Sequence, residues 1–256
     1  DGLDVYAYRD SWLHRWDSRF KLVGLMALAF VYSFIQDPRL LPLMLLVTLG
    51  LYVASGLPFP FLISRLRAPG VFILVLAILL PFVTGTTVLA RLGPLAIYQE
   101  GVWAMVVLVV KFISILTISL VLFSTAPFLN LIKAMRALGL PLILADMILL
   151  AYRYIHEIGG DLRKMEMAMR HRGFRARRLS MRVLTVFASL AGSLLVRSYE
   201  RSERVYQAMI VRGYGHCPRP EDQFHARLAD GLGLAGAFII AAGLVALEIA
   251  LRRGGM

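Results

Sequence analysis

Residues 101–123 read GVWAMVVLVVKFISILTISLVLF, an apolar stretch with one charged residue, Lys111. As a helix these 23 residues would be about 35 Å long, enough to cross the roughly 30 Å hydrocarbon core of a bilayer. The whole chain has the same character, because 59% of its 256 residues are apolar and only 17% are charged. So few charges cannot cover a soluble domain of this size. The composition therefore indicates a polytopic membrane protein and argues against an ordinary soluble enzyme or a disordered chain.

Other apolar runs predict further membrane spans on both sides of this stretch. They are Leu22–Gln36, Leu40–Leu57, Gly70–Ala90 and Leu228–Leu251. The first two are separated only by the turn signal around Asp37-Pro38, so we expect them to form a helical hairpin. The third would pair in the same way with residues 101–123. The sequence thus predicts an all-α polytopic membrane protein with about five transmembrane helices.

Basic residues indicate how these spans are oriented. The chain has 28 Lys and Arg against 16 Asp and Glu, and residues 124–227 alone hold 17 basic and 8 acidic residues. Lys and Arg collect on the cytoplasmic side of membrane proteins. Two apolar runs within this region, Leu138–Leu150 and Val183–Val196, are short for a bilayer. If Val183–Val196 crossed, the basic blocks on its two sides would face opposite compartments, so we predict that it does not cross.

Three regions follow from this orientation. Residues 1–123 form an N-terminal segment and four transmembrane helices, residues 124–227 a cytoplasmic helical region, and residues 228–256 a C-terminal transmembrane helix. The N-terminus is expected in the cytoplasm and the C-terminus outside. Twenty-three of the 28 basic residues then face the cytoplasm.

A short pattern occurs twice within the cytoplasmic region. Ala168–Phe174 reads AMRHRGF and Ala208–Tyr214 reads AMIVRGY, so both copies follow Ala-Met-x-x-Arg-Gly-aromatic. Each copy ends a helix-favouring stretch, and a glycine just past a helix, followed by an aromatic residue, is a C-capping signal. One interpretation is that Arg172 and Arg212 only complement the dipoles of their helices. The other is that two rigid helix ends each present an arginine to a partner with two similar sites, such as a dimer.

These motifs resemble those of a known family. The N-terminal element Leu13–Lys21 (LHRWDSRFK), the segments Ser124–Pro127 and Ala137–Pro141, and the two arginine tips are similar to the transmembrane T component, EcfT, of energy-coupling factor transporters. The resemblance is greatest to its cobalt-type branch, CbiQ. The family's X-Arg-X motifs correspond here to His171-Arg172-Gly173 and Val211-Arg212-Gly213. The resemblance covers most of the chain.

The sequence departs from the family pattern in two places. Ser18 stands where the family usually has a proline, and His171 and Val211 precede the arginines where alanine is commonest. Both arginines are retained.

The resemblance implies a coupling mechanism. The two tips would dock on a pair of cytoplasmic ABC ATPases (CbiO-like), and the membrane helices would hold a substrate-binding S component (CbiM-like, with or without a small CbiN-like subunit). ATP binding would move the tips and tilt the S component, which then releases its substrate inward. The chain would be a non-catalytic, multi-pass subunit of a bacterial or archaeal cytoplasmic membrane. Cobalt is the cargo we expect, from the N-terminal element and the Gly-Tyr-Gly after Arg212; nickel and vitamins are the alternatives.

The sequence offers little chemistry of its own. It contains no Walker A pattern, so ATP should be bound by partner subunits and no cofactor by this chain. His216, Cys217 and His225 are the nearest approach to a metal site, but their spacing fits no standard zinc pattern and we interpret them as a solvated loop. Ligands for a transported cobalt ion are then expected on the S component. Nucleic acid is not expected as a partner.

Several other residues are expected to have roles within the membrane or at its surface. Lys111 is either an intramembrane functional charge or, as we favour, an interior side chain bonded to carbonyl groups. Trp12, Trp16 and Trp103 are expected as interfacial anchors, and Glu248 as an interfacial residue. Stripes of small residues allow close helix approach, within the chain or against the S component; they are Gly233, Ala237 and Ala241, and Ala188 and Gly192.

Two other functional classes remain open from the sequence alone. An intramembrane enzyme would need converging catalytic groups inside the spans, and only Lys111 lies deep in one. A membrane scaffold could bind anionic lipid through its basic region, with about 1 kcal/mol from each Lys or Arg near the surface. The scaffold explains the charge but leaves the repeated tips unexplained.

The orientation is testable by labelling. In Arg212→Cys, the new cysteine should react with a membrane-impermeant thiol reagent only from the cytoplasmic side. Labelling from the outside would mean that Val183–Val196 crosses the membrane.

Overall fold

The computed structural model describes residues 12–83, 87–92, 95–174, 180–214 and 228–254. The chain divides into two compact units. The first, called the membrane unit here, comprises residues 1–139 and 224–256; the second, the helix-pair unit, comprises residues 140–223. The elements of the membrane unit are α1 (Trp12–Arg15), α2 (Ser18–Phe34), the 3-10 turn η2 (Pro38–Leu40), α3 (Leu41–Ser55), α4 (Phe59–Val83), β1 (Val88–Leu92), β2 (Leu95–Tyr98), α5 (Gln99–Thr125), α6 (Phe128–Ala137) and α9 (Leu228–Gly254). The helix-pair unit contains α7 (Leu142–His171) and α8 (Met181–Val211).

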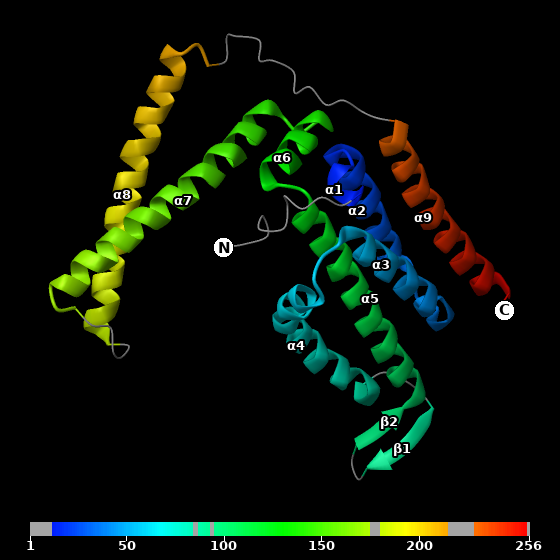
Figure 1. The fold of residues 1–256 in the computed structure, drawn as a ribbon. Coiled ribbons are helices and arrows are strands. Elements are labelled where there is room, and N and C mark those ends of the chain that lie inside the picture. Colours follow the sequence, from blue (N-terminus) through cyan, green and yellow to red (C-terminus); the bar gives the residue numbers. More distant parts are fainter. Residues whose placement is uncertain (1–11, 84–86, 93–94, 175–179, 215–227, 255–256) are drawn as a thin grey trace. The chain divides into compact units, whose positions relative to one another are not determined.

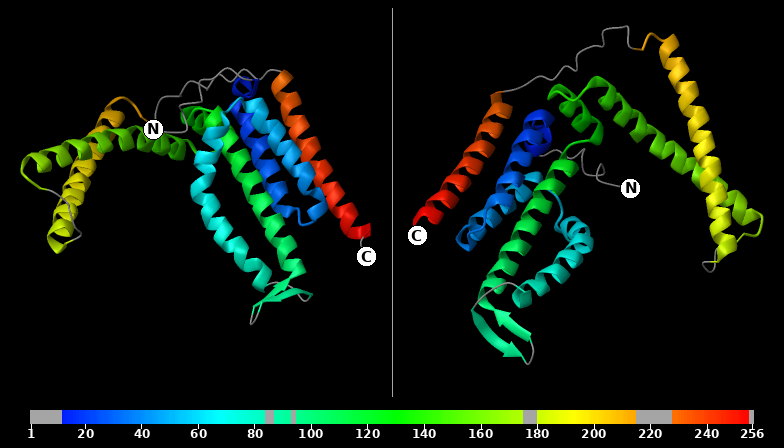
Figure 2. Two further views of the ribbon diagram at one scale, coloured as in Figure 1. Left: turned by 60° about the horizontal axis from the view of Figure 1, so that its bottom comes forward. Right: turned by 180° about the vertical axis from the view of Figure 1, so that it is seen from behind.

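α5 is the central helix of the membrane unit. It packs against α2, α3 and α4, and α9 packs against the other side of α2 (Figures 1 and 2). Four helical segments in the described part are long and apolar enough to cross a membrane, namely Pro38–Ser55, α4, α5 and Leu228–Arg253. The remaining predicted span, Leu22–Gln36, corresponds to α2, which has 17 residues and is about 26 Å long.

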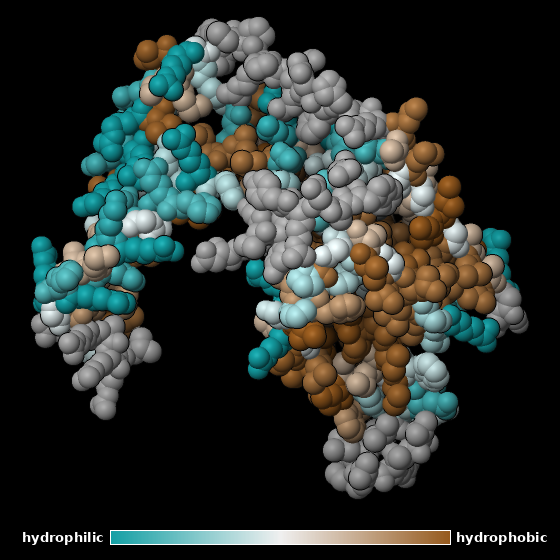
Figure 3. Space-filling model, in the orientation of Figure 1, coloured by the Kyte–Doolittle hydropathy of each residue, from teal (hydrophilic) through white to brown (hydrophobic). Residues whose placement is uncertain are grey.

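Large apolar side chains cover the outside of the membrane unit. Phe30, Phe72 and Val83 are 66%, 73% and 78% exposed, respectively. Figure 3 shows the resulting apolar surface over this unit and a mostly hydrophilic surface over the helix-pair unit. A soluble protein rarely exposes such a continuous apolar area. The exposed surface is therefore the one that lipid or another membrane protein covers.

The third predicted span was misplaced in the sequence analysis. The helix begins at Phe59 and ends at Val83, whereas the sequence predicted Gly70–Ala90. Arg65 and Arg67 therefore lie on the first turns of α4. The residues after it form the antiparallel hairpin β1–β2, with Leu92 opposite Leu95. In the sequence the polar residues 84–87 (TGTT) separate this helix from Val88–Ala90, and the predicted span wrongly ran through them. Within the described residues the fold is all-α except for this hairpin.

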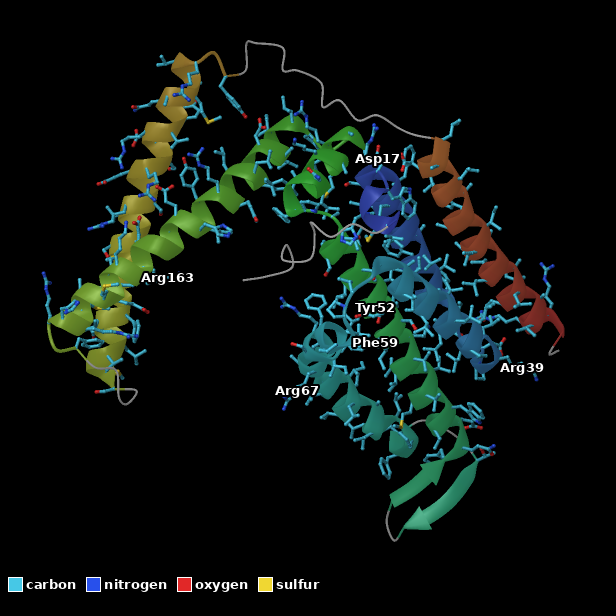
Figure 4. All side chains as sticks on the ribbon, in the orientation of Figure 1. Asp17, Arg39, Tyr52, Phe59, Arg67 and Arg163 are labelled. Carbon is cyan, nitrogen blue, oxygen red and sulfur yellow. The ribbon has the colours of Figure 1, made fainter. Side chains whose placement is uncertain are left out.

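The turn before α4 is closed by side chains. Gly56 takes a φ of 66° at the end of α3, a left-handed conformation that glycine adopts without strain. The Tyr52 hydroxyl donates a 2.9 Å hydrogen bond to the carbonyl of Pro58. The Tyr52 ring also lies 5.5 Å from the ring of Phe59 (Figure 4). With these contacts, α4 starts eleven residues before the predicted span.

The N-terminal element forms a buried junction at one end of the membrane unit. The Asp17 side chain accepts a hydrogen bond from Arg19 N (2.9 Å) and caps α2, which stabilises the first turn. Trp16 Nε1 donates to the carbonyl of Asp230 on α9 (3.1 Å), and Asp17 N donates to Asp230 Oδ1 (3.1 Å). Lys21 is fully buried and donates to the carbonyl of Thr125 at the end of α5 (3.3 Å). The element therefore ties α2 to both α5 and α9.

Trp16 was expected at the membrane interface, and this prediction was wrong. Its side chain is 7% exposed and packs on α9, where a Cβ added to Gly233 would lie 3.0 Å from the ring. A Cβ added to Gly24 of α2 would likewise lie 3.2 Å from Ala237. Ala241 is also buried. The small residues Gly233 and Ala237 of α9 thus pack against Trp16 and α2 of the same chain, which is the internal-packing alternative.

A second polar cluster lies at the opposite end of the helices. Lys111 Nζ donates to the carbonyl of Ser33 (2.8 Å), as the favoured interpretation of this lysine expected. Glu248 is 6% exposed. It accepts hydrogen bonds from the amides of Gln36 (3.1 Å) and Asp37 (3.4 Å) and pairs with Arg252 at 3.1 Å. Glu248 is therefore a buried cap of the α2–α3 turn, and its position at the membrane interface stays a prediction.

Two further predictions concern boundaries and anchors. The sequence placed residue 124 at the start of the cytoplasmic region, and this boundary stays a prediction. In the structure α6 packs against α2, and Leu131 and Ile132 of α6 are buried. Trp103 is 53% exposed, which is compatible with the interfacial position predicted for it. The Trp12 side chain lies outside the described residues.

The packing of Trp16 on α9 predicts opposite effects of two similar substitutions. Gly233→Ala should lower the midpoint of thermal unfolding of the purified chain, because overpacking the Trp16 contact costs about 1–3 kcal/mol. Gly236→Ala, on the same helix with open space around an added Cβ, should raise the midpoint slightly, because alanine favours helix by about 1 kcal/mol over glycine. Equal effects of the two changes would contradict the packing described here.

Candidate functional site

The two helices of the helix-pair unit run antiparallel. Arg201 of α8 contacts Asp161 of α7, with 3.1 Å between Nη2 and Oδ2. Just past the end of α8, Tyr214 donates a hydrogen bond to Asp146 near the start of α7, with 2.8 Å between the hydroxyl and Oδ2. A residue later in the chain than Arg201 therefore meets a residue of α7 that precedes Asp161. The carboxyl ends of the helices lie at opposite ends of the pair (Figure 1).

This arrangement separates the two arginines of the repeated pattern. Tyr214, two residues beyond Arg212, donates a hydrogen bond to Asp146, so Arg212 lies near the start of α7. Arg172 lies 26 residues after Asp146, at the end of α7. Since a helix rises 1.5 Å per residue, Arg172 and Arg212 are about 40 Å apart. The helix-pair unit thus carries one arginine at each end.

The helix ends have the same capping geometry. Gly173 and Gly213 have φ of 82° and 79°. In the first copy, Phe174 N donates to the carbonyl of Met169 (3.1 Å) and Gly173 N to that of Arg170 (3.0 Å). This double hydrogen bond is a Schellman motif. The prediction of a glycine C-cap is confirmed there.

The second copy repeats every part of the cap. Tyr214 N donates to the carbonyl of Met209 (2.9 Å) and Gly213 N to that of Ile210 (2.9 Å). In both copies the arginine is the last residue before the left-handed glycine. The backbone that carries each arginine is therefore fixed by its own hydrogen bonds, and the aromatic residue after each glycine is half-buried.

The side chains at both tips are available to a partner. Arg172, His171 and Arg212 are exposed, and Val211 is 87% exposed. An exposed arginine on a rigid turn can place its planar guanidinium against carbonyl or carboxylate oxygens. The tips therefore have the geometry of two docking points, one at each end of the unit.

The surroundings of Arg172 include a groove between the two helices. Its volume is about 440 Å³, and it is lined by side chains from both helices, among them Met165 and Met169 of α7 and Leu190 and Ser193 of α8. Arg172 is also one of the lining residues. One tip therefore adjoins a partly apolar depression.

The remaining predicted residues are distributed as follows. Ala188 and Gly192 are exposed on α8, and an added Cβ at Gly192 would meet open space, so their contact with an S component stays a prediction. His216, Cys217 and His225 lie outside the described residues. Within the described ranges, the structure contains no group of three or more His, Cys, Asp or Glu that could hold a metal ion.

The contacts between the helices were missed in the sequence analysis. Glu157 and Asp161 are one turn apart on α7, and both pair with Arg201. Acidic residues four apart are a signal that a helix faces a cation, but nothing in a single sequence says that this cation lies 40 residues further along the chain.

Comparison with known proteins gives the family. The model of the CbiQ family, described as "Cobalt transport protein", matches residues 9–225. This range contains the N-terminal element and both arginine tips. The chain belongs to the CbiQ family.

Individual relatives agree with the CbiQ assignment. Over 253 residues the chain is 28% identical to the energy-coupling factor transporter transmembrane protein EcfT of Bacillus selenitireducens, with 94% of each chain covered. It is 31% identical over 218 residues to EcfT of Limosilactobacillus fermentum, with 80% of each covered. It also matches 22% of the length of a putative ABC transporter ATP-binding protein of Bifidobacterium longum, at 28% identity over 63% of this chain. As a CbiQ member, the chain is a multi-pass membrane protein.

The caps of this CbiQ member can be tested by hydrogen exchange. In Gly173→Ala, the positive φ costs about 1–2 kcal/mol, so the Phe174 amide should exchange severalfold faster, as measured by mass spectrometry of the peptide that ends α7. Gly160→Ala on the same helix, where an added Cβ meets open space, is the control and should slow exchange or leave it unchanged. Unchanged exchange in Gly173→Ala would contradict the capping role of Gly173.

Proposed function

We propose that this chain is the coupling subunit of an ATP-driven importer of the energy-coupling factor type. In this proposal Arg172 and Arg212 dock on a pair of cytoplasmic ABC ATPases and transmit their motion to a substrate-binding S component. The observation that carries it is the pair of identically capped, exposed arginine tips at opposite ends of one antiparallel helix pair. Two matched tips, about 40 Å apart, suit two matched sites on a dimer.

Charge and relationship both favour an ATPase as the partner. Arginine is the side chain best suited to bonding several oxygens of a partner at once. The sequence contains no Walker A pattern, so nucleotide would be hydrolysed elsewhere in the assembly. One relative, named as an ATP-binding protein, contains a segment similar to this chain. Such a protein is what a coupling subunit and its ATPase would look like if joined in one chain.

Cobalt is the proposed cargo, with nickel or a vitamin as the alternative. The description of the CbiQ family supports cobalt, while several of the most similar relatives carry the general name EcfT. The apolar surface of the membrane unit is available to an S component. The N-terminus and the helix-pair unit are placed in the cytoplasm, because the ATPases act there.

The arginines should be tested in the assembled transporter. Arg172→Ala and Arg212→Ala should each weaken co-purification of the ATPases by about 30-fold in affinity, because an arginine anchor at an interface contributes about 2 kcal/mol or more. The double variant should abolish ATP-driven uptake of labelled cobalt in proteoliposomes containing the cognate S component. Parallel uptake assays with labelled nickel would decide between the two metals.

Matched controls separate docking from general charge. Arg163 on α7 (Figure 4) and Arg204 on α8 are exposed and lie away from the tips. Arg163→Ala and Arg204→Ala remove the same charge and should leave assembly and uptake close to the wild type. If all four single variants lose activity equally, a scaffold that binds anionic lipid explains the basic region better. Full transport by the double variant would refute the coupling role.

A further inference from the structure

The residue after each capping glycine distinguishes the two tips. Phe174 follows Gly173, and Tyr214 follows Gly213. The Tyr214 hydroxyl donates a 2.8 Å hydrogen bond to Oδ2 of Asp146 near the start of α7, whereas Phe174 has no polar atom in its side chain. The end of α8 is therefore tied to the neighbouring helix by a contact that the end of α7 cannot make.

A second polar contact joins the helices nearer the middle. Arg201 of α8 lies 3.5 Å from Glu157 and 3.1 Å from Asp161, and its side chain is 28% exposed. Asp146 and Asp161 are 15 residues apart on α7, or about 22 Å. Two contacts at this distance prevent a rotation of α8 about α7 that either contact alone would permit. The helix pair is thereby braced as one body.

We propose that Tyr214 and Asp146 form a latch that fixes the direction in which Arg212 projects. This proposal rests on the ATPase-docking role proposed above. Tyr214 serves twice, because its amide closes the cap of α8 and its hydroxyl binds α7. With the latch closed, a force on Arg212 moves α7 together with α8; with the latch open, the end of α8 moves alone. Tyr214 and Asp146 are thus positioning residues, and neither has to contact the ATPase.

The strength of the contact is sufficient for this role. A phenol that donates to a carboxylate makes one of the stronger hydrogen bonds in proteins. Removal of such a bond shifts the balance between closed and open latch by about tenfold or more. The shift is expected to change the distribution of helix positions without unfolding either helix, since both Schellman caps and the Arg201 ion pairs remain.

The latch can be measured by the distance between two spin labels. Labels on cysteines that replace the exposed residues Arg153 of α7 and Gln207 of α8, with Cys217→Ser to remove the native cysteine, report the separation of the helices in the full-length chain, with and without the ATPases. Tyr214→Phe and Asp146→Ala should broaden the distance distribution. Asp146→Asn retains an oxygen that can accept the hydrogen bond from the phenol, and should restore a narrow distribution.

Coupling is the second readout. In proteoliposomes with the ATPases and the cognate S component, Tyr214→Phe and Asp146→Ala should raise the ATP hydrolysed per cobalt ion imported, by up to about tenfold, while the ATPases still co-purify. Tyr206→Phe, which removes the hydroxyl of an exposed tyrosine on α8, is the matched control and should resemble the wild type in both readouts.

The outcomes separate this proposal from the proposed function. A distribution in Tyr214→Phe as narrow as that of the wild type overturns the latch. A broadened distribution with unchanged coupling overturns the positioning role, and the docking role stands if Arg212→Ala still loses coupling. If Arg212→Ala leaves coupling intact, the docking role fails, and the latch has no part in transport.

Discussion

The antiparallel pairing of α7 and α8 is the constraint on which the candidate site depends. If the helices ran parallel, Arg172 and Arg212 would lie side by side. The contacts of Arg201 with Asp161 and of Tyr214 with Asp146 fix the opposite arrangement, with one arginine at each end. Each arginine is then held by a cap that uses only local backbone atoms. Pairing sets the distance between the tips, and capping sets their local shape.

In the membrane unit, polar contacts join the helices at both of their ends. Buried polar groups in an apolar surrounding are stable only when they are bonded. Lys21 and Asp17 satisfy the ends of α5 and α2 at one junction, and Glu248 and Lys111 satisfy the α2–α3 turn and the end of α2 at the other. The apolar side chains between the junctions are left free to face lipid. Removal of one member of a junction would leave its partner buried and unpaired.

Local signals in the sequence predicted local structure well. The glycine caps at residues 173 and 213 were predicted from the pattern alone, because a Schellman motif depends on neighbouring residues. The carbonyl bond of Lys111 was expected because few other partners are available within a membrane. The start of α4 was missed because it depends on the Tyr52 contacts across a turn. The hairpin after α4 was missed because the predicted span was extended past the polar residues 84–87 to Ala90. The buried contacts of Trp16 and Glu248 were not predicted because their partners lie more than 200 residues away along the chain.

The two motifs that carry the family resemblance differ in burial, and so in what explains their residues. In the N-terminal element, Trp16 and Lys21 are enclosed by other helices, so packing is sufficient to explain the residues found there. At the tips, Arg172 and Arg212 are exposed, and the Schellman caps use backbone atoms that any side chain at these positions would leave in place. The described fold thus accounts for both caps without either arginine, and the exposure of Arg172 and Arg212 supports the proposal that they bind a partner.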